Sequence, residues 1–271
     1  MAAFPECIDE PVFWQTTTTA AMRGLVMGIF GYAERGAALN ASIETASLTV
    51  PLIINFGSPF RIALGRRPEG RDAIASFVAG LFAGPVFMDS DGAAQCIQIN
   101  FTPVGGRLFF GRPMSALAGE MVDLGDWGDR EISSLANCLA DLRSWPDRLS
   151  LAARFVEYRL QKSHPVDASV DWAFRAMHSC RGNIRIGKIA AELDWSRRKL
   201  VERFREEIGL PPKAIARIIR FNTAQSLALA ATSPNWADIA AECGYADQAH
   251  LAREFADLAG SPPTGWRRAA A

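Results

Sequence analysis

The chain has 271 residues, of which 49% are hydrophobic and 21% are charged, an ordinary composition for a folded protein with room for two domains. The 29 basic and 29 acidic side chains balance, so the net charge alone does not indicate a nucleic-acid partner. No run of about eighteen uncharged apolar residues occurs, and we therefore expect no membrane span.

The N-terminal residues and the cysteines both favour the cytoplasm. Residues 1–7 lack the basic and apolar regions of a signal peptide. The five cysteines are scattered and never form a Cys-x-x-Cys pair, which favours a reducing compartment over disulfides or a zinc site. We expect buried structural thiols at Cys96, Cys138 and Cys243.

Residues up to about 110 are predicted to form mainly strands. Four short segments are rich in β-branched or aromatic residues and are separated by turn-forming residues. They are residues 25–31, 46–56, 76–82 and 94–101. In the last segment, polar side chains alternate with Ile97, Ile99 and Phe101, as in a half-buried strand. This pattern favours an antiparallel sandwich or a small barrel.

Helices are predicted after this region. They cover residues 114–121, 131–142 and 147–161. The polar segment that follows contains Pro165, which discourages helix at the preceding residue. We place a β-rich domain with trailing helices at residues 1–163, a linker at 164–169 and a second domain at 170–271.

The second domain contains an internal repeat. Ile-Ala-Ala-Glu-Leu at residues 189–193 returns as Ile-Ala-Ala-Glu-Cys at 239–243, and the phase slips by about one residue at the turn that follows each copy. The predicted helices are residues 172–178, 186–193, 196–208, 212–231, 236–243 and 247–258. Two short helix pairs in tandem indicate paired helix-turn-helix DNA-binding modules. The segment 181–220 carries a net charge of about +6, so the positive charge lies on the first module.

The second helix of the first module is predicted to be a recognition helix. Leu200 and Phe204 would pack inward, while Arg198 would donate to guanine and Glu202 would accept from cytosine. The residues placed for phosphates are Arg197, Lys199 and Arg205. The alternative is a solvated face whose arginines pair with Glu202 and Glu206; the repeat favours DNA.

The corresponding helix of the second module has a thinner polar face. Leu251 and Phe255 would pack inward. Gln248 suits adenine, and Arg253 suits guanine or a phosphate. His250 lies on the flank, where it either packs or contacts a phosphate.

The spaced residues of the second domain form a pattern. It runs Ile189-Ala190-x-x-Leu193, Ser196-x-x-x-Leu200-x-x-x-Phe204, Gly209, Pro211, Arg220, Trp236-x-x-Ile239-Ala240-x-x-x-Gly244-Tyr245-x-Asp247-Gln248-x-His250-Leu251-x-Arg253-x-Phe255 and Gly260-x-Pro262. In this pattern, residues 170–266 resemble the DNA-binding domain of the AraC/XylS family of bacterial transcriptional regulators. The resemblance implies seven helices, with the two recognition helices entering successive major-groove segments on one face of double-stranded DNA.

The N-terminal half resembles, more weakly, the β-rich sensor domains that precede this module in one branch of the family. The marks are Ile97-Gln98-Ile99-Asn100-Phe101-Thr102-Pro103-x-Gly105, Arg112-Pro113-Met114-Ser115-x-Leu117 and Val122-Asp123-Leu124. This resemblance implies sensing of a small-molecule effector or formation of a homodimer, without naming an effector.

Enzymatic alternatives lack the residues they need. No histidine precedes His164, so the β-rich domain has no ligand set for a cupin-like metal enzyme. Gly105-Gly106 lacks the Lys-Ser/Thr partner of a phosphate loop, and Asp89-Ser90-Asp91-Gly92 resembles a hairpin turn and lacks the other ligands of a calcium loop. Isolated Cys7 does not support the zinc-bound cysteine cluster of a DNA-repair methyltransferase. We therefore expect no enzyme, cofactor or metal.

The sequence thus predicts an α+β protein with two domains: a sandwich-like or barrel-like sensor domain with trailing helices, and an all-α tandem helix-turn-helix domain. The predicted function is a cytoplasmic, sequence-specific, effector-responsive transcriptional regulator that forms a homodimer and contacts RNA polymerase if it is an activator. The alternative is an architectural or co-regulatory DNA-binding protein whose N-terminal domain binds a protein partner and no small molecule.

Overall fold

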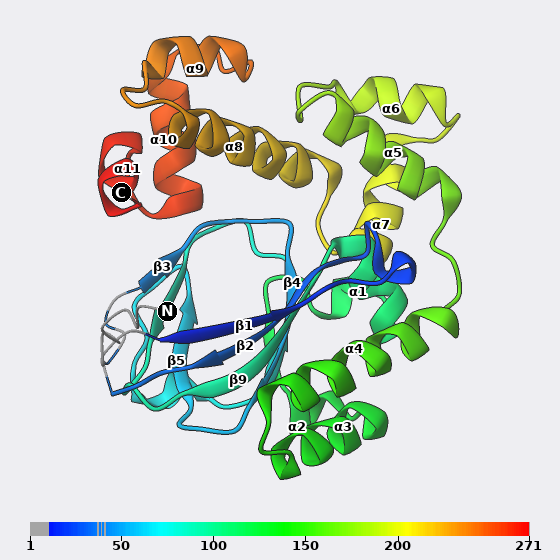
Figure 1. The fold of residues 1–271 in the computed structure, drawn as a ribbon. Coiled ribbons are helices and arrows are strands. Elements are labelled where there is room, and N and C mark those ends of the chain that lie inside the picture. Colours follow the sequence, from blue (N-terminus) through cyan, green and yellow to red (C-terminus); the bar gives the residue numbers. More distant parts are fainter. Residues whose placement is uncertain (1–10, 37, 39, 41, 271) are drawn as a thin grey trace.

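The computed structural model describes residues 11–36, 38, 40 and 42–270. Figure 1 shows two sheets in the N-terminal part and helices in the rest of the chain. The six-stranded sheet has the order β1-β2-β9-β4-β7-β10, with strands Val12–Thr16, Val26–Ala33, Gln95–Phe101, Val50–Asn55, Phe77–Ala79 and Met121–Asp123. The four-stranded sheet has the order β3-β8-β5-β6, with strands Ser42–Glu44, Val86–Asp89, Phe60–Leu64 and Ala73–Ile74. This architecture confirms the predicted α+β fold class.

The sheets contain the four predicted strands and others that the sequence pattern did not indicate. β2, β4, β7 and β9 overlap the predicted segments, although β4 begins at Val50 rather than at Ala46. β3, β6, β8 and β10 have two to four residues each, too few for an alternation pattern to be recognised. The predicted hairpin turn at residues 89–92 is wrong, because β8 and β9 on either side of it lie in different sheets.

A helix interrupts the region that we predicted as strands. Residues 103–110 form α1 (Pro103–Phe110). Thr102 caps this helix by accepting a hydrogen bond from the Gly105 N–H at 3.1 Å, and Pro103 lies in the first turn, where its missing N–H costs nothing. These end signals outweigh the strand preference of the aromatic residues that follow.

Three helices connect the sheets to the C-terminal part. They are α2 (Leu124–Trp127), α3 (Arg130–Asp141) and α4 (Trp145–Gln161). α4 packs on the six-stranded sheet, where Trp145 stacks on Trp14 of β1 with ring centroids 4.3 Å apart. The predicted helix at residues 114–121 is wrong: only Met114–Ala116 form a 3₁₀ turn (η3), and the chain enters β10 after Gly119, whose φ is 71°.

Seven helices lie between residues 168 and 270, as the family resemblance implied. They are α5 (Ala168–Ser179), α6 (Ile186–Glu192), α7 (Arg197–Ile208), α8 (Pro212–Ala230), α9 (Trp236–Glu242), α10 (Gln248–Ala259) and α11 (Pro263–Ala269). α5 begins before its predicted start because the Asp167 carboxylate caps it, accepting from the Ser169 N–H at 2.8 Å. No helix in the described part of the chain is long and apolar enough to cross a membrane.

The hydrophobic cores divide the molecule unevenly. One core runs from the outer face of the six-stranded sheet, including Ile99 and Phe101, through α4 to Leu200 and Phe204 of α7. A second core holds α8 to α11 and includes only Ala46 and a few neighbours from the N-terminal part. The first helix-turn-helix module therefore shares its core with the N-terminal part, whereas the second module has a core of its own.

The cysteines are placed partly as predicted. Cys96 and Cys243 are buried, but Cys138 on α3 is exposed, so the prediction of a buried thiol there is wrong. α3 is amphipathic, and its buried stripe consists of Ile132, Leu135 and Leu139. Cys138 lies outside this stripe and is therefore exposed. Cys7 lies outside the described residues.

Candidate nucleic-acid interface

The two helix-turn-helix modules are built on the same local geometry. The turn residues Asp194 and Gly244 both adopt the left-handed conformation, with φ of 51° and 73°. Ser196 caps α7 by accepting from the Lys199 N–H at 3.1 Å, and Asp247 caps α10 in the same way. The turns are 50 residues apart and the caps 51, so the one-residue slip predicted from the sequence lies between them.

The inward faces of α7 and α10 match as well. Leu200 and Phe204 are fully buried, and so are their counterparts Leu251 and Phe255. With these pairs fixed at i and i+4, the opposite face of each helix is directed to solvent. The repeat therefore presents two equivalent helix faces.

On α7 the five predicted site residues are all exposed. They are Arg197, Arg198, Lys199, Glu202 and Arg205. Arg198 is 89% exposed and donates from Nε to Glu202 Oε1 at 2.7 Å. The Lys199 ammonium lies 4.5 Å from the centre of the Trp195 ring. The ion pair between Arg198 and Glu202 corresponds to the alternative we considered for this face, but an exposed pair of this kind contributes little and separates readily.

Arg203, on the side of α7, has a structural role that sequence reasoning missed. Its guanidinium bonds Asp167 at 3.0 Å and also contacts Glu206 and Glu207. Burial alone would raise the pKa of Asp167, but the hydrogen bonds from Arg203 and from backbone N–H groups lower it overall. A second cation, Arg107 of α1, reaches Glu207 at 3.0 Å. This network attaches α7 to the N-terminal part, and only the spacing of Arg203 from Glu206 and Glu207 was visible beforehand.

On α10 the predicted residues separate into two groups. Gln248 and Arg253 are exposed. His250 is half-buried: its Nδ1 accepts from the Ala246 N–H at 3.4 Å, and its ring packs edge-on against Tyr245 with centroids 5.3 Å apart. His250 is thus packed, as in one of the two roles that we considered for it, through Nδ1 and its contact with Tyr245. The other ring nitrogen, Nε2, makes no hydrogen bond with the described residues and can contact a phosphate.

The long helix α8 sets the separation of the modules. It has 19 residues and is therefore about 28 Å long. Figure 1 shows it running between α5 and α6 at one end and α9 and α10 at the other. Arg217 of α8 bonds Glu254 at 2.9 Å and Asp257 at 3.2 Å, which fixes the orientation of α10.

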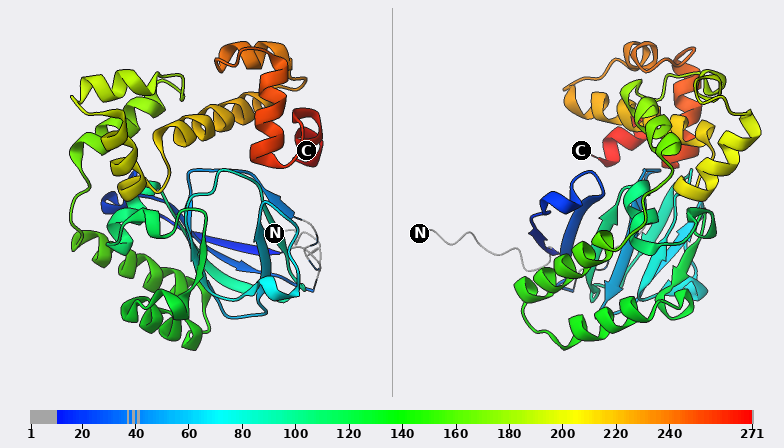
Figure 2. Two further views of the ribbon diagram at one scale, coloured as in Figure 1. Left: turned by 180° about the vertical axis from the view of Figure 1, so that it is seen from behind. Right: turned by 90° about the vertical axis from the view of Figure 1, so that its right-hand side faces the viewer.

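The N-terminal part contacts the C-terminal ends of both recognition helices. Gly209, after α7, lies against Met114, and Gly260, after α10, lies against Pro85 and Phe87. The Ala46 N–H also donates to the Leu258 carbonyl at 2.8 Å. Both views in Figure 2 show the helical modules on one side of the sheets. The first turns of α7 and α10, where most of the predicted site residues lie, are not covered by the N-terminal part.

The C-terminal part matches a known family. Residues 189–269 match a family model described as a helix-turn-helix domain, and this segment is an AraC-type helix-turn-helix domain. No curated protein sequence matches the chain.

The solved structures that match the chain have low sequence identity and TM-scores below 0.5. ToxT from Vibrio cholerae with a bound unsaturated fatty acid is 12% identical, covering 91% of this chain and 97% of that chain, with a TM-score of 0.46. The C-terminal domain of AraT, a response regulator from Geobacillus stearothermophilus, is 23% identical over 38% of this chain and 87% of its own, with a TM-score of 0.36. The AraC-like transcriptional activator CuxR is 14% identical over 82% and 88%, with a TM-score of 0.27.

Proposed function

We propose that this protein is a sequence-specific, double-stranded-DNA-binding transcriptional regulator that acts in the cytoplasm. The observation that carries the proposal is the pair of equivalent modules, with the same buried frame and the same exposed helix face, inside an AraC-type helix-turn-helix domain. The modules are joined by α8, and the proposal places α7 and α10 in two successive segments of the major groove on one face of DNA. No catalytic step is part of this function.

The exposed residues of α7 and α10 take different roles in the proposal. Arg198 donates to guanine O6 and N7, and Glu202 accepts from cytosine N4 once their mutual ion pair opens. Gln248 contacts adenine, and Arg253 contacts guanine or a phosphate. The remaining basic residues, assigned to phosphates, are Arg197, Lys199, Arg205 and, through Nε2, His250.

Residues 1–163 serve in this proposal as the sensor or dimerisation domain, 164–169 as the linker and 170–271 as the DNA-binding domain. The contacts that the N-terminal part makes with the ends of both recognition helices support a role in controlling DNA binding. A homodimer would present four recognition helices, and RNA polymerase would be a further partner if the protein activates transcription. The second candidate, an architectural protein without an effector, is compatible with the same DNA-binding surface.

A gel shift with DNA from the region upstream of the protein's own coding sequence tests the proposal. We expect a shift that random DNA of equal length does not compete away, and an affinity that falls steeply between 50 and 200 mM salt, by about 10³-fold if some six phosphates are contacted. Equal affinity for specific and random DNA would exclude a sequence-specific regulator. Affinity that is independent of salt would contradict the phosphate contacts.

A further inference from the structure

A partly open cavity of about 440 Å³ lies between the two sheets, a volume typical of small-molecule sites. Alternate residues of the strands line it, among them Cys96, Gln98 and Asn100 of β9 and, opposite, Ile62 and Leu64 of β5. The other face of β9 packs on the helices. The polar residues that we expected on a solvated strand face are therefore directed into the cavity.

Two neighbouring amides on β9 are among the polar residues that line the cavity. Gln98 Nε2 donates to Asn100 Oδ1 at 3.0 Å. In the described part of the chain, Gln98 Oε1 and Asn100 Nδ2 make no hydrogen bond to the protein, so one acceptor and one donor remain for a ligand. Most of the remaining wall is apolar or aromatic.

The cavity offers no compensation for an anion. No lysine, arginine or histidine is among its described lining residues. The Glu44 side chain lines its edge and is exposed by surface area, but desolvation raises the pKa of its carboxyl, which favours the neutral form. Burial raises the pKa of the Cys96 thiol to about 12 and also raises that of Tyr32, so both remain neutral at pH 7. A carboxylate or phosphate inside would lose hydration without gaining a cationic partner.

Residues 45–49, which we call the connecting segment, form a wall of this cavity and also contact the DNA-binding domain. Thr45, Ala46, Ser47 and Thr49 line the cavity. On its other side, the connecting segment accepts two hydrogen bonds from α8. The Asn222 amide donates to the Ala46 carbonyl at 2.9 Å, and the Gln225 amide donates to the Thr45 hydroxyl at 3.1 Å. It thus lies between the cavity and the long helix that separates the two modules.

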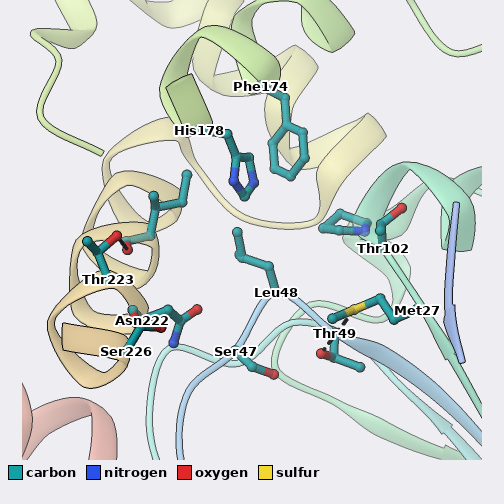
Figure 3. Close-up of a pocket in the computed structure, with 12 residues that line it drawn as sticks. Met27, Ser47, Leu48, Thr49, Thr102, Phe174, His178, Asn222, Thr223 and Ser226 are labelled. Atoms are coloured by element: carbon teal, nitrogen blue, oxygen red, sulfur yellow. Dashed lines mark hydrogen bonds between the residues drawn. The ribbon is translucent and has the colours of Figure 1, made fainter. Parts of the chain in front are cut away.

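Figure 3 shows a second, smaller cavity on the far side of the connecting segment. Ser47, Leu48 and Thr49 form one wall, and His178 of α5 and Asn222 of α8 face them. Because Ser47 and Thr49 line both cavities, the connecting segment has free space on each side. Ala46 of the same segment is buried in the core of α8 to α11, so a shift of the segment changes the packing of that core.

We infer that the cavity between the sheets binds an uncharged, largely apolar ligand with one hydrogen-bonding group, and that the connecting segment transmits its binding to α8 and α10. This inference rests on the proposed function, because it supplies the effector of that regulator. Gln98 and Asn100 orient the ligand through its polar group. A filled cavity displaces the connecting segment and alters its hydrogen bonds to α8.

Two fluorescent probes that differ by one charged group test the ligand class on the full chain. N-phenyl-1-naphthylamine is uncharged, and 8-anilinonaphthalene-1-sulfonate has the same ring system with an added sulfonate. We expect saturable one-site binding of the neutral probe and binding of the sulfonate that is weaker by about tenfold or more. Equal affinity for the two probes, or no binding of the neutral one, would overturn the inference.

Gln98→Lys places a cation in the cavity and is expected to shift the preference toward the sulfonate. Gln95→Lys is the matched control, because Gln95 lies at the exposed start of the same strand and outside the cavity lining; it should leave both affinities unchanged. Thermal melting verifies that Gln98→Lys is folded. If it is not, Met88→Trp, which fills the cavity from β8, should abolish binding of the neutral probe, and unaltered binding in that variant would place the probe elsewhere.

Operator binding with and without saturating neutral probe tests the transmission. We expect the probe to change the affinity of the wild-type protein for its operator. In Asn222→Ala this change should be smaller by at least about half, while the affinity of the variant for the probe stays at the wild-type value. Ser226→Ala is the control, because among the described residues its hydroxyl bonds only the Asn222 carbonyl within α8. An undiminished effect in Asn222→Ala contradicts the transmission. Loss of specific DNA binding without any probe would refute the proposed function, whereas normal DNA binding without probe binding would refute only this inference.

Discussion

Arg198 and Lys199 are neighbours on α7 to which the proposal assigns different parts of the DNA, so replacing each by alanine separates the two roles. Lys199→Ala removes one phosphate contact and should lower the slope of log affinity against log salt by about 0.9 for every DNA sequence. Arg198→Ala removes a bidentate base contact and should reduce discrimination against a substituted guanine by about 5- to 150-fold. Neither side chain is packed, since both are exposed, so neither variant should alter the melting temperature appreciably.

Fluorescence anisotropy measures both effects, with the operator and a single-base variant titrated at four salt concentrations. The free-state ion pair between Arg198 and Glu202 enters the comparison, because alanine at 198 also releases the Glu202 carboxylate. The pair is exposed and contributes little, but the released Glu202 is itself assigned to cytosine, so discrimination is compared only at the guanine that Arg198 contacts. Arg71→Ala is the control: this arginine is 72% exposed on the N-terminal part, far along the chain from the modules. If Arg198→Ala weakens all sequences equally, the base contact is wrong and Arg198 is a phosphate ligand.

Three further predictions concern stability. Arg107→Met leaves the Glu207 carboxylate, 6% exposed, without one of its cations, and should lower the free energy of unfolding in urea by about 1–3 kcal/mol; replacing both residues by methionine should restore part of the loss. Asp129 caps α3. Burial alone would raise the pKa of its carboxyl, but hydrogen bonds from Arg159 and from backbone N–H groups lower that pKa overall. The carboxylate therefore stabilises the folded state above the unfolded pKa of about 3.9, and this stabilisation is lost as the pH falls through the lower folded pKa. Asp129→Asn should therefore flatten the decline of melting temperature measured between about pH 5 and pH 2. Gly244→Ala should destabilise by about 1–2 kcal/mol in thermal melts, because φ is 73° and the new Cβ would lie 2.7 Å from a neighbouring amide, whereas Asp194→Gly at the equivalent turn should be neutral or stabilising.

The C-terminal part was predictable because its local signals agree with its packing. Ser196 and Asp247, the first residues of two predicted helices, cap α7 and α10, and the i, i+4 pair Leu200 and Phe204 is buried as its spacing required. The N-terminal part was harder, because β3 and β6 depend on partners that are distant in the sequence. The capping signal at Thr102 was present, but the strand pattern before it was extended over α1.

The candidate site was predictable in its exposed residues and not in its supports. Exposure of Arg198 and Arg205 follows from helical periodicity once the buried pair is fixed. The attachment of α7 through Arg203, Asp167 and Glu207 joins residues on different elements, which no local pattern contains. The cavity was missed for a similar reason: an alternating strand indicates two faces, and only the opposing sheet determines that the polar face of β9 is enclosed.

The two modules differ in how they are held, and this difference decides which of them an effector can move. The first module shares a continuous core with the N-terminal part and is attached through buried ionic contacts at Glu207, so its displacement would disrupt packing. The second module has its own core and contacts the N-terminal part mainly through hydrogen bonds of the connecting segment and through Gly260. Most of the basic face lies on the first module, whose affinity for phosphates does not depend on sequence. Under the proposed function, the first module therefore supplies a fixed attachment to DNA that includes the base contacts of Arg198 and Glu202, and the effector changes the position of the second module, with Gln248 and Arg253.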